Sequence, residues 1–411
     1  MNIKLRYVIW FLLFSFFKNQ YSFADVTIVP SPPKVPASSY LLMDHNSGEI
    51  LIEENIHQKL PPASLTKMMT VYVVANELKK GSISLLDEVM VSKKAYDTLG
   101  SRMFIEIGDR VKLNDLLLGV VVQSGNDASV ALAEHVSGSE EVFANLMNQH
   151  ALHLGMKNTQ FANSTGMPVE GTEHSTTAYD LAILARALIK DYPEVYDLHK
   201  IKEFTYGSNP PIKQYNRNKL LWRDKSVDGI KTGHTEEAGY CLVASAIRDD
   251  MRLISVVMGA SGENTRAKAS QTNLNYGYRF YETHKLYNKG DVVTNARVWK
   301  ANTDSIELTV KDDFYITIPR GQYDKLDPVV EIDTKIIAPI EQGDRQGVLN
   351  IFLSAPALIN NLRASLLPFI AANMRGVKLI DSLASMSALA SSNGPSQAQA
   401  TTKCKGLMKF I

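Results

Sequence analysis

The sequence has few cysteines, almost no excess of charge and none of the short motifs that hold metals or nucleotides. Its two cysteines, Cys241 and Cys404, lie far apart in the chain, so their spacing leaves a disulfide open but unsupported. A formal net charge of +1 over 411 residues gives no reason to expect nucleic acid as a partner. There is no His-Glu-x-x-His motif, no cysteine–histidine cluster with zinc-ligand spacing and no Walker loop. The sequence therefore predicts no metal site and no other cofactor.

The apolar run at the N-terminus is too short for a comfortable membrane span. Lys4 and Arg6 precede it, residues 7–17 form it, and Ser22-Phe23-Ala24 then places small residues where a signal peptidase reads. This layout predicts a cleavable signal peptide over residues 1–24. We therefore expect export to the periplasm or to the outer face of the cytoplasmic membrane. The alternative is a buried N-terminal helix.

Residues 25–285 have the pattern of one α+β domain. The expected elements are, in chain order, strands at 39–44 and 49–54, a helix at 64–80, a mostly helical stretch at 114–191, strands at 239–246 and 251–259, and a helix at 265–281. Strands at both ends with helices between them predict an α+β fold of roughly 260 residues. Gly81 is the expected stop of the first helix.

Residues 290–353 have a different texture, with short strands separated by turn residues. The expected strands lie at 296–299, 305–310, 314–318, 329–332 and 347–352. This pattern predicts a small, sandwich-like all-β domain. The remainder, 354–411, is a tail rich in alanine, serine and leucine.

The first motif that can carry chemistry is Ser64-Leu65-Thr66-Lys67, at the start of the first expected helix. A spacing of three places the Ser64 hydroxyl and the Lys67 amine on one helix face. A lysine can activate a serine only if burial or nearby positive charge keeps its amine neutral. Taken alone the motif is weak, because a helix cap followed by a solvated lysine has the same sequence.

The second motif, Gln123-Ser124-Gly125-Asn126-Asp127, lies between two apolar helical stretches. Ser124 can relay a proton between a lysine and a leaving group, and the carboxamide of Asn126 can bond a substrate amide. An ordinary turn between helices uses the same residue types, so this motif is also weak by itself.

The third motif, Lys231-Thr232-Gly233-His234, comes just before a strong strand signal. A strand edge can pair with an extended peptide, and Lys231 with Thr232 can hold a terminal carboxylate. Gly233 would let a substrate backbone approach closely. The alternative is a lysine and a glycine in a turn that enters a strand.

The three motifs occur together in the order that is the known signature of penicillin-binding proteins and class A β-lactamases, on a chain predicted to be exported. The stretches that extend the likeness are 62–69, 123–128, 216–218, 228–235, 252–259 and 315–321. With them the sequence resembles the low-molecular-mass D-alanyl-D-alanine carboxypeptidases over about residues 38–353. The resemblance implies a β-lactamase/transpeptidase-like catalytic domain followed by the small β domain of this subgroup. Ser-Gly-Asn in the middle motif is closer to the carboxypeptidases than to class A β-lactamases.

The resemblance also implies roles for individual residues. Ser64 would be the acyl-ester nucleophile, Lys67 the general base, Ser124 an aid to proton transfer and Asn126 a substrate-holding group. The carboxylate side of the substrate would bind at Lys231, Thr232 and Gly233, the backbone N–H groups of Ser64 and His234 would form the oxyanion hole, and Arg217 and Arg266 match arginines near the cleft.

The implied activity is removal of the terminal D-alanine from a peptidoglycan pentapeptide, with β-lactam antibiotics as inhibitors that acylate the same serine. Two alternatives stay open. One is a β-lactamase, against which the sequence shows no Glu-x-x-x-Asn pattern after Ser124. The other is a non-catalytic wall-binding protein on the same fold, since a fold alone does not define a function.

The tail departs from the subgroup, whose members end in an amphipathic helix at the membrane surface. Ile359, Leu362 and Leu366 approach helical spacing, but Pro368 and Gly376 would interrupt a helix. Binding to the inner-membrane surface is therefore open, as is a changed reading frame near residue 353.

Overall fold

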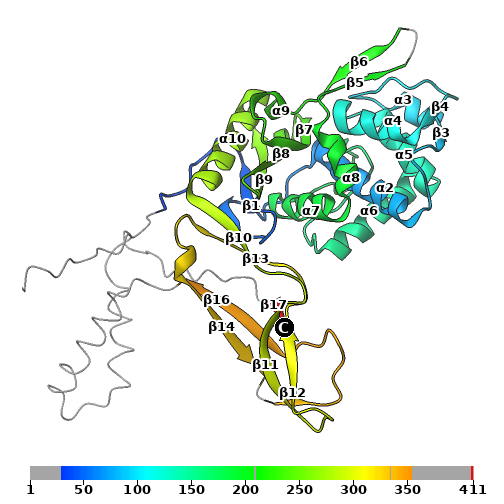
Figure 1. The fold of residues 1–411 in the computed structure, drawn as a ribbon. Helices are drawn as coiled ribbons and strands as arrows, with labels where there is room; N and C mark the ends of the chain where they lie inside the picture. Colours follow the sequence, from blue (N-terminus) through cyan, green and yellow to red (C-terminus); the bar gives the residue numbers. More distant parts are fainter. Residues whose placement is uncertain (1–28, 208–209, 334, 354–408, 411) are drawn as a thin grey trace, which may run out of the picture. The chain divides into compact units, whose positions relative to one another are not determined.

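The computed structural model describes residues 29–207, 210–333, 335–353 and 409–410 (Figure 1). The expected signal peptide, Cys404 and most of the tail lie outside these residues. Two compact units make up the described chain. The larger comprises Pro30–Asn295 and Glu307–Pro319, and the smaller includes Ala296–Ile306 and the chain from Arg320 onward. The boundary that the sequence suggests between residues 285 and 290 stays a prediction.

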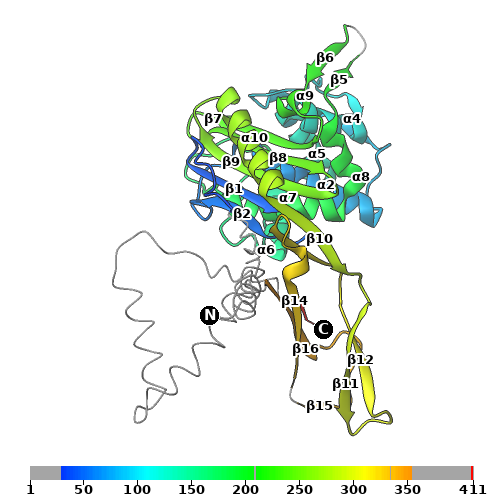
Figure 2. The ribbon, with the colours of Figure 1, turned by 60° about the vertical axis from the view of Figure 1, so that its left-hand side comes forward.

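The centre of the larger unit is an antiparallel five-stranded sheet in the order β2-β1-β9-β8-β7 (Figure 2). Its strands are β1 (Ser39–Asp44), β2 (Ile50–Glu54), β7 (Val227–Thr235), β8 (Gly239–Arg248) and β9 (Met251–Ala260). The middle of β8 and of β9 is buried on both faces, which explains their nearly continuous apolar runs. The predicted hairpin of the first two strands is confirmed, and β7 lies at an edge of the sheet.

Helices cover both faces of this sheet. Because successive side chains of a strand point to opposite faces, neighbours on β1 enter different cores. Leu41 and Met43 join the core formed with the helical part, whereas Leu42 lies against Gly277 of helix α10 (Glu263–Phe280). Figure 2 shows α10 running along the sheet.

The helical part of the larger unit follows the first strands. Its elements are the 3-10 turn η1 (Ala63–Thr66), α2 (Lys67–Lys80), α3 (Lys93–Asp97), α4 (Leu113–Leu118), the π-helical turn η2 (Gly119–Gln123), α5 (Asn126–Ser137), α6 (Glu140–Leu154) and α7 (Ala178–Asp191). Helix α2 is buried over its first nine residues and ends at Gly81, whose φ of 74° closes the helix as predicted. The serine and threonine side chains before α3, α6 and α7 cap those helices.

Short elements complete the larger unit. They are β3 (Glu88–Met90) paired with β4 (Arg110–Lys112), α8 (Pro193–Tyr196), the 3-10 turn η3 (Asp197–Lys200), β5 (Glu203–Tyr206) paired with β6 (Ile212–Tyr215), α9 (Leu220–Arg223), and β10 (Tyr281–Tyr287) paired with β13 (Phe314–Pro319). Asp44, at the end of β1, accepts a hydrogen bond of 2.7 Å from Thr283 of β10.

The smaller unit consists of short strands. Its elements are parts of β11 (Val292–Trp299) and β12 (Ser305–Thr309), which both include residues of the larger unit, and the 3-10 turn η4 (Tyr323–Lys325), β14 (Leu326–Ile332), β15 (Ile336–Ile337), β16 (Gly347–Leu353) and β17 (Lys409–Phe410). Two sheets result, in the orders β12-β11-β15 and β14-β16-β17. Throughout the described part of the chain, no helix combines the length and apolar character needed to cross a membrane.

Candidate active site

The candidate nucleophile, Ser64, lies in the 3-10 turn that leads into α2. Pro61 and Pro62 stand before the turn, where their fixed φ angles restrict the backbone. Lys67 is the first residue of α2, and its Nζ lies 3.1 Å from Ser64 Oγ. The two groups are therefore within hydrogen-bond distance, as their spacing predicts.

Lys67 is buried completely, with 0% of its surface exposed. Burial, reinforced by the positive charge of Arg217, lowers the pKa of its amine to about 7, although Asp127 and Glu140 act to raise it. An ordinary lysine is protonated at neutral pH, whereas this one is divided between the charged and the neutral form. A neutral amine is what a general base requires.

The hydrogen bonds around Lys67 suit the neutral form. Its amine donates to Asn126 Oδ1 and to the Thr165 carbonyl, each at 2.6 Å. A neutral amine has two hydrogens and one lone pair, so these two carbonyl oxygens engage both hydrogens. The third neighbour is the Ser64 hydroxyl, which can then donate its proton to the lone pair.

A second buried lysine belongs to the edge strand β7. Lys231 Nζ donates to Ser124 Oγ at 2.8 Å and to its neighbour's carbonyl, Thr232 O, at 3.0 Å. Burial, together with the positive charges of Lys67, Arg217 and Arg266, lowers the pKa of Lys231 well below its usual value. Ser124 follows the π-helical turn with a φ of 64°, so an irregular backbone presents its hydroxyl to this lysine.

The start of α5 connects the site to the loop at 99–105. Asn126 Nδ2 donates to the Leu99 carbonyl at 2.6 Å, while its oxygen accepts from Lys67. The buried carboxylate of Asp127 accepts from the backbone N–H groups of Met103 at 2.9 Å and Phe104 at 2.8 Å. The bonds of Asn126 to Leu99 and Lys67 fix the orientation of its carboxamide, because the nitrogen must donate and the oxygen must accept.

The segment 163–176 closes the other side of Lys67. Glu140 accepts from both the backbone and the hydroxyl of Ser164, at 3.0 and 2.6 Å, and thereby holds this segment. Gly166 has a φ of 89°, and a Cβ at this position would lie 1.8 Å from the Ala63 carbonyl oxygen. Only glycine therefore allows the segment to approach the residue before Ser64 so closely.

Near its C-terminal end, β7 lies against the turn that carries Ser64. A Cβ on Gly233 would lie 3.1 Å from the Pro62 carbonyl oxygen, and Arg266 of α10 donates to the Gly233 carbonyl at 2.9 Å. His234 is exposed, and its ring stacks on Tyr240 at a centroid distance of 3.9 Å. Arg266 therefore holds the backbone of β7 at Gly233 through this hydrogen bond.

The sequence-predicted residues thus fall into two hydrogen-bonded groups and their surroundings. Ser64, Lys67 and Asn126 form one group, and Ser124, Lys231 and Thr232 form the other. Arg217 is exposed, and its charge lowers the pKa of both buried lysines.

Four further residues shape the site without having been predicted to do so. They are Asp127, Thr165, Gly166 and His174, whose Nε2 lies 3.0 Å from the Thr66 hydroxyl. Asp127 stands inside the second motif, so its position was visible in the sequence. Thr165 contributes a backbone carbonyl, which no residue type can reveal.

A serine beside a partly neutral lysine, and a second serine bonded to a buried lysine of an edge strand, define a serine acyl-transferring hydrolase of the penicillin-binding kind. Comparison with known proteins agrees. Residues 26–262 match the family model described as D-alanyl-D-alanine carboxypeptidase, and residues 281–360 match the C-terminal domain of penicillin-binding protein 5. The chain belongs to the D-alanyl-D-alanine carboxypeptidase family of serine hydrolases.

Individual relatives support the same assignment. The chain is 43% identical over 334 residues to the D-alanyl-D-alanine carboxypeptidase DacC of Escherichia coli, covering 79% of this chain and 82% of DacC. DacA of the same organism is 40% identical over 340 residues, covering 81% of this chain and 83% of DacA. The alternatives of a β-lactamase and a non-catalytic wall protein are not favoured.

Solved structures confirm the fold predicted from the sequence. Penicillin-binding protein 5 of Haemophilus influenzae superimposes with a TM-score of 0.75 at 40% identity, over 80% of this chain and 95% of that one. Penicillin-binding protein D2 of Listeria monocytogenes, in its ampicillin-bound form, gives a TM-score of 0.55 at 29% identity over 60% of this chain and 100% of that one.

Proposed function

We propose that this protein removes the terminal D-alanine from peptidoglycan stem peptides through an acyl-enzyme on Ser64. The observation that carries the proposal is the amine of Lys67, which lies 3.1 Å from the Ser64 hydroxyl and has both its neutral-form hydrogens engaged by carbonyls. The names of the relatives supply the substrate class.

Acylation begins when Lys67 takes the hydroxyl proton and Ser64 Oγ attacks the carbonyl carbon of the penultimate D-alanine. The negative charge that develops on the carbonyl oxygen of the penultimate D-alanine is stabilised by the backbone N–H groups of Ser64 and His234. The C–N bond then breaks, and the departing D-alanine amine needs a proton. Ser124 supplies it in a relay from the lysines, since its hydroxyl already accepts from Lys231.

Deacylation reverses the roles with water in place of the serine hydroxyl. Lys67 takes a proton from a water molecule, whose oxygen attacks the ester carbonyl, and Ser64 leaves with that proton. The products are the shortened peptide and the free serine. One base therefore serves both halves of the reaction.

Substrate orientation depends on the carboxylate end and on the edge strand. Lys231, Thr232 and the exposed Arg217 provide cationic and hydroxyl partners for the terminal carboxylate. An extended peptide pairs with the free side of β7, with Gly233 allowing close approach, and Asn126 bonds its amide. Arg266 acts through Gly233 and is a positioning residue.

A β-lactam would react along the same route, because its strained amide presents a carbonyl and a carboxylate to the same groups. The ampicillin-bound structure of the Listeria relative supports this part of the proposal. A β-lactam ring stays attached after its C–N bond opens, so no small leaving group departs.

We also propose export through the N-terminal signal, and attachment of the tail to the inner-membrane surface. Both rest on sequence pattern: the layout of residues 1–24 and the amphipathic spacing within 354–411. Co-sedimentation with phosphatidylglycerol vesicles tests the attachment, with protein ending at residue 353 as the control. Equal binding by both proteins would contradict it.

The proposal is tested with a synthetic pentapeptide ending in D-Ala-D-Ala and with a fluorescent penicillin. We expect D-alanine release and covalent labelling of the purified protein. Ser64→Ala should lower both by at least about 10³-fold, because Ser64 is the one hydroxyl bonded to the Lys67 amine among the described residues. Unchanged thermal melting of the variant shows that its fold is intact. Turnover that survives Ser64→Ala would disprove the mechanism, and penicillin hydrolysis faster than D-alanine release would favour a β-lactamase.

A further inference from the structure

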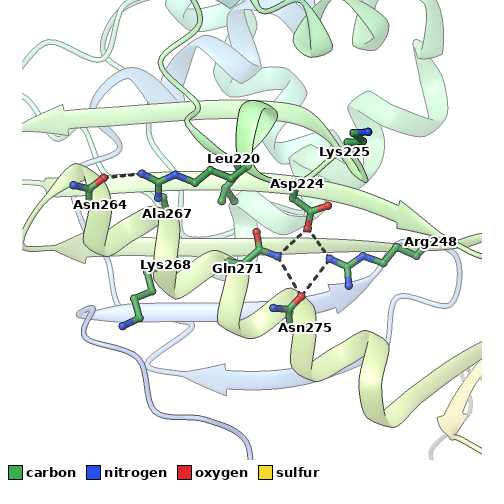
Figure 3. A pocket seen from close by; sticks show the side chains of 10 residues that line it. Leu220, Asp224, Lys225, Arg248, Asn264, Ala267, Lys268, Gln271 and Asn275 are labelled. Carbon is green, nitrogen blue, oxygen red and sulfur yellow. Dashed lines mark hydrogen bonds and ion pairs between the residues drawn. The ribbon is translucent and has the colours of Figure 1, made fainter.

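A second concave site lies in the larger unit, outside the Ser64 cluster. It is a groove of about 600 Å³ between α10 and the segment that joins α9 to β7 (Figure 3). Four cationic side chains line it, namely Arg223, Lys225, Arg248 and Lys268, together with one carboxylate, Asp224. The lining therefore carries a net charge of +3.

The charge of the single carboxylate is already compensated. Asp224 accepts from Arg248 at 2.6 Å and from Gln271 at 2.8 Å, and its other oxygen accepts from the backbone and the hydroxyl of Ser226. Although burial acts to raise it, these hydrogen bonds lower the pKa of Asp224 to about 2. The pair Asp224–Arg248 is thus a neutral unit at the centre of the groove, and Figure 3 shows it joined to Gln271 and Asn275.

The other three cations have no carboxylate partner among the described residues. Arg223 bonds only the neutral Asn264 oxygen, at 2.8 Å, so most of its N–H groups stay available. Lys225 and Lys268 are exposed and form no hydrogen bond or ion pair in the described part of the chain. Figure 3 places Lys225 and Lys268 on either side of the Asp224 network. Excess positive charge around a neutral centre attracts an anion.

Amide groups give the groove a second recognition property. Gln271 and Asn275 are fixed by the network, yet the Gln271 oxygen and the Asn275 amide nitrogen have no partner among the described residues. They can accept from and donate to a ligand amide. A ligand that satisfies the whole groove therefore carries both carboxylates and amides.

The groove begins beside the catalytic strand. Asn264 lies on the first turn of α10, two residues before Arg266, which holds the Gly233 carbonyl of β7. Lys219, just before α9, is paired with Glu263 of α10 at 2.6 Å. The Asn264 end of the groove therefore lies near the arginine that holds Gly233, whereas Asp224 and Arg248 lie at the Val227 end of β7.

We propose that this groove binds a second stem peptide of the peptidoglycan, adjacent to the one whose terminal D-alanine is removed. Stem peptides have free carboxylates and several amides, which is the combination that the groove offers. The polymer presents many stems close together, so a second contact raises the effective concentration of cleavable ends at Ser64. This inference rests on the proposed function, because it takes peptidoglycan as the substrate.

The test uses full-length protein whose Ser64 has been acylated by penicillin, so that the cleft is occupied. The probe is N-acetylmuramyl-tetrapeptide, which lacks the terminal D-alanine, and binding is measured by calorimetry. We expect binding to persist in the acylated protein. The double variant Lys225→Glu/Lys268→Glu should weaken it about tenfold or more, since two charge-assisted contacts are lost. The control Lys112→Glu/Lys157→Glu changes the net charge equally at exposed sites outside the groove and should bind normally.

A kinetic comparison complements the binding test. The Lys225/Lys268 double variant should release D-alanine from a free pentapeptide at the normal rate but more slowly from intact sacculi. No muropeptide binding to the acylated protein, equal binding by the two double variants, or binding to phosphatidylglycerol vesicles instead would overturn the groove assignment. Loss of penicillin labelling and of D-alanine release by unmodified protein would instead refute the proposed function, so the two failures are distinguishable.

Discussion

The site around Ser64, called the cleft below, and the groove beside α10 both contain lysines, but the environments of these lysines are opposite. Lys67 and Lys231 are at most 4% exposed, and burial lowers the pKa of both amines. Lys225 and Lys268 are exposed and have no carboxylate partner among the described residues. Burial therefore favours the neutral form of the lysines around Ser64, whereas the lysines of the groove remain in contact with solvent.

The two regions also differ in how tightly the backbone is packed. In the cleft, three separate segments meet around Ser64: the turn at 61–66, the segment 163–176 and the end of β7. The groove is formed by side chains of α10, of α9 and the segment that follows it, and of the end of β8. We therefore expect the cleft to be sensitive to small steric changes and the groove to charge alone.

The largest contrast should come from removing one lysine from each region. Lys67→Met introduces an apolar side chain of similar length and removes the amine. Penicillin acylation of Ser64 should therefore fall by about 10³-fold. Lys225→Met should leave that rate unchanged. Stopped-flow acylation with mass spectrometry of the adduct measures both. If the two variants acylated at similar rates, the amine of Lys67 would not be the base.

A smaller effect is expected from one methyl group at Gly166. Gly166→Ala would place a Cβ 1.8 Å from the Ala63 carbonyl oxygen and would force a φ of 89° on alanine. The free energy of unfolding should drop by about 2–4 kcal/mol, and acylation should slow because Ala63 precedes the nucleophile.

Gly171 offers the matched control for this substitution. It has a similar φ of 71°, but nothing lies within 4 Å of its Cβ position. Gly171→Ala should therefore cost only the backbone strain, about 1 kcal/mol. Urea denaturation of the two variants separates strain from collision, and equal losses would show that the close approach at Gly166 is unimportant.

The smallest expected effect is a shift of the pH profile by Arg217. Because the charge of Arg217 helps lower the pKa of Lys67, Arg217→Gln should raise that pKa. Acylation requires the neutral amine, so the rate rises with pH through about 7 in the unmodified protein. In the variant the rise should move to higher pH, with an acylation rate at pH 7 about twofold lower beyond any change in affinity.

Two controls sharpen this measurement. Arg217→Lys keeps the positive charge and should keep the original midpoint, even if substrate affinity changes. Saturating substrate removes the contribution of binding, so that the remaining change reports on the base. If the midpoint of the pH profile did not change in Arg217→Gln, the arginine would act on the substrate alone.

Local sequence patterns predicted the parts of the site that depend on short spacing. The three-residue interval between Ser64 and Lys67 was sufficient to place hydroxyl and amine together, because a helical turn fixes that geometry. The glycine of Asn46-Ser47-Gly48 has the positive φ, 78°, that the predicted hairpin needs. Ser124 likewise lies between helical elements, as expected.

Contacts between distant segments could not be predicted in this way. The carbonyl that fixes Lys67 belongs to Thr165, 98 residues later, and any residue type can supply a carbonyl. Strand β10 was also missed. It follows α10 directly and pairs with β13 some thirty residues on, and its burial is only partial, so its sequence shows no clear apolar alternation.

The two carbonyl oxygens that engage the amine of Lys67 leave the proposed base a single line of approach. Both its hydrogens point to Asn126 and Thr165, so a proton can reach the lone pair only from the side on which Ser64 stands. A water that completes the second half-reaction must use that same opening. If Lys67 is the base, as proposed, an acyl group bulky enough to fill this opening would block deacylation, and access to one nitrogen atom would set the lifetime of the acyl-enzyme.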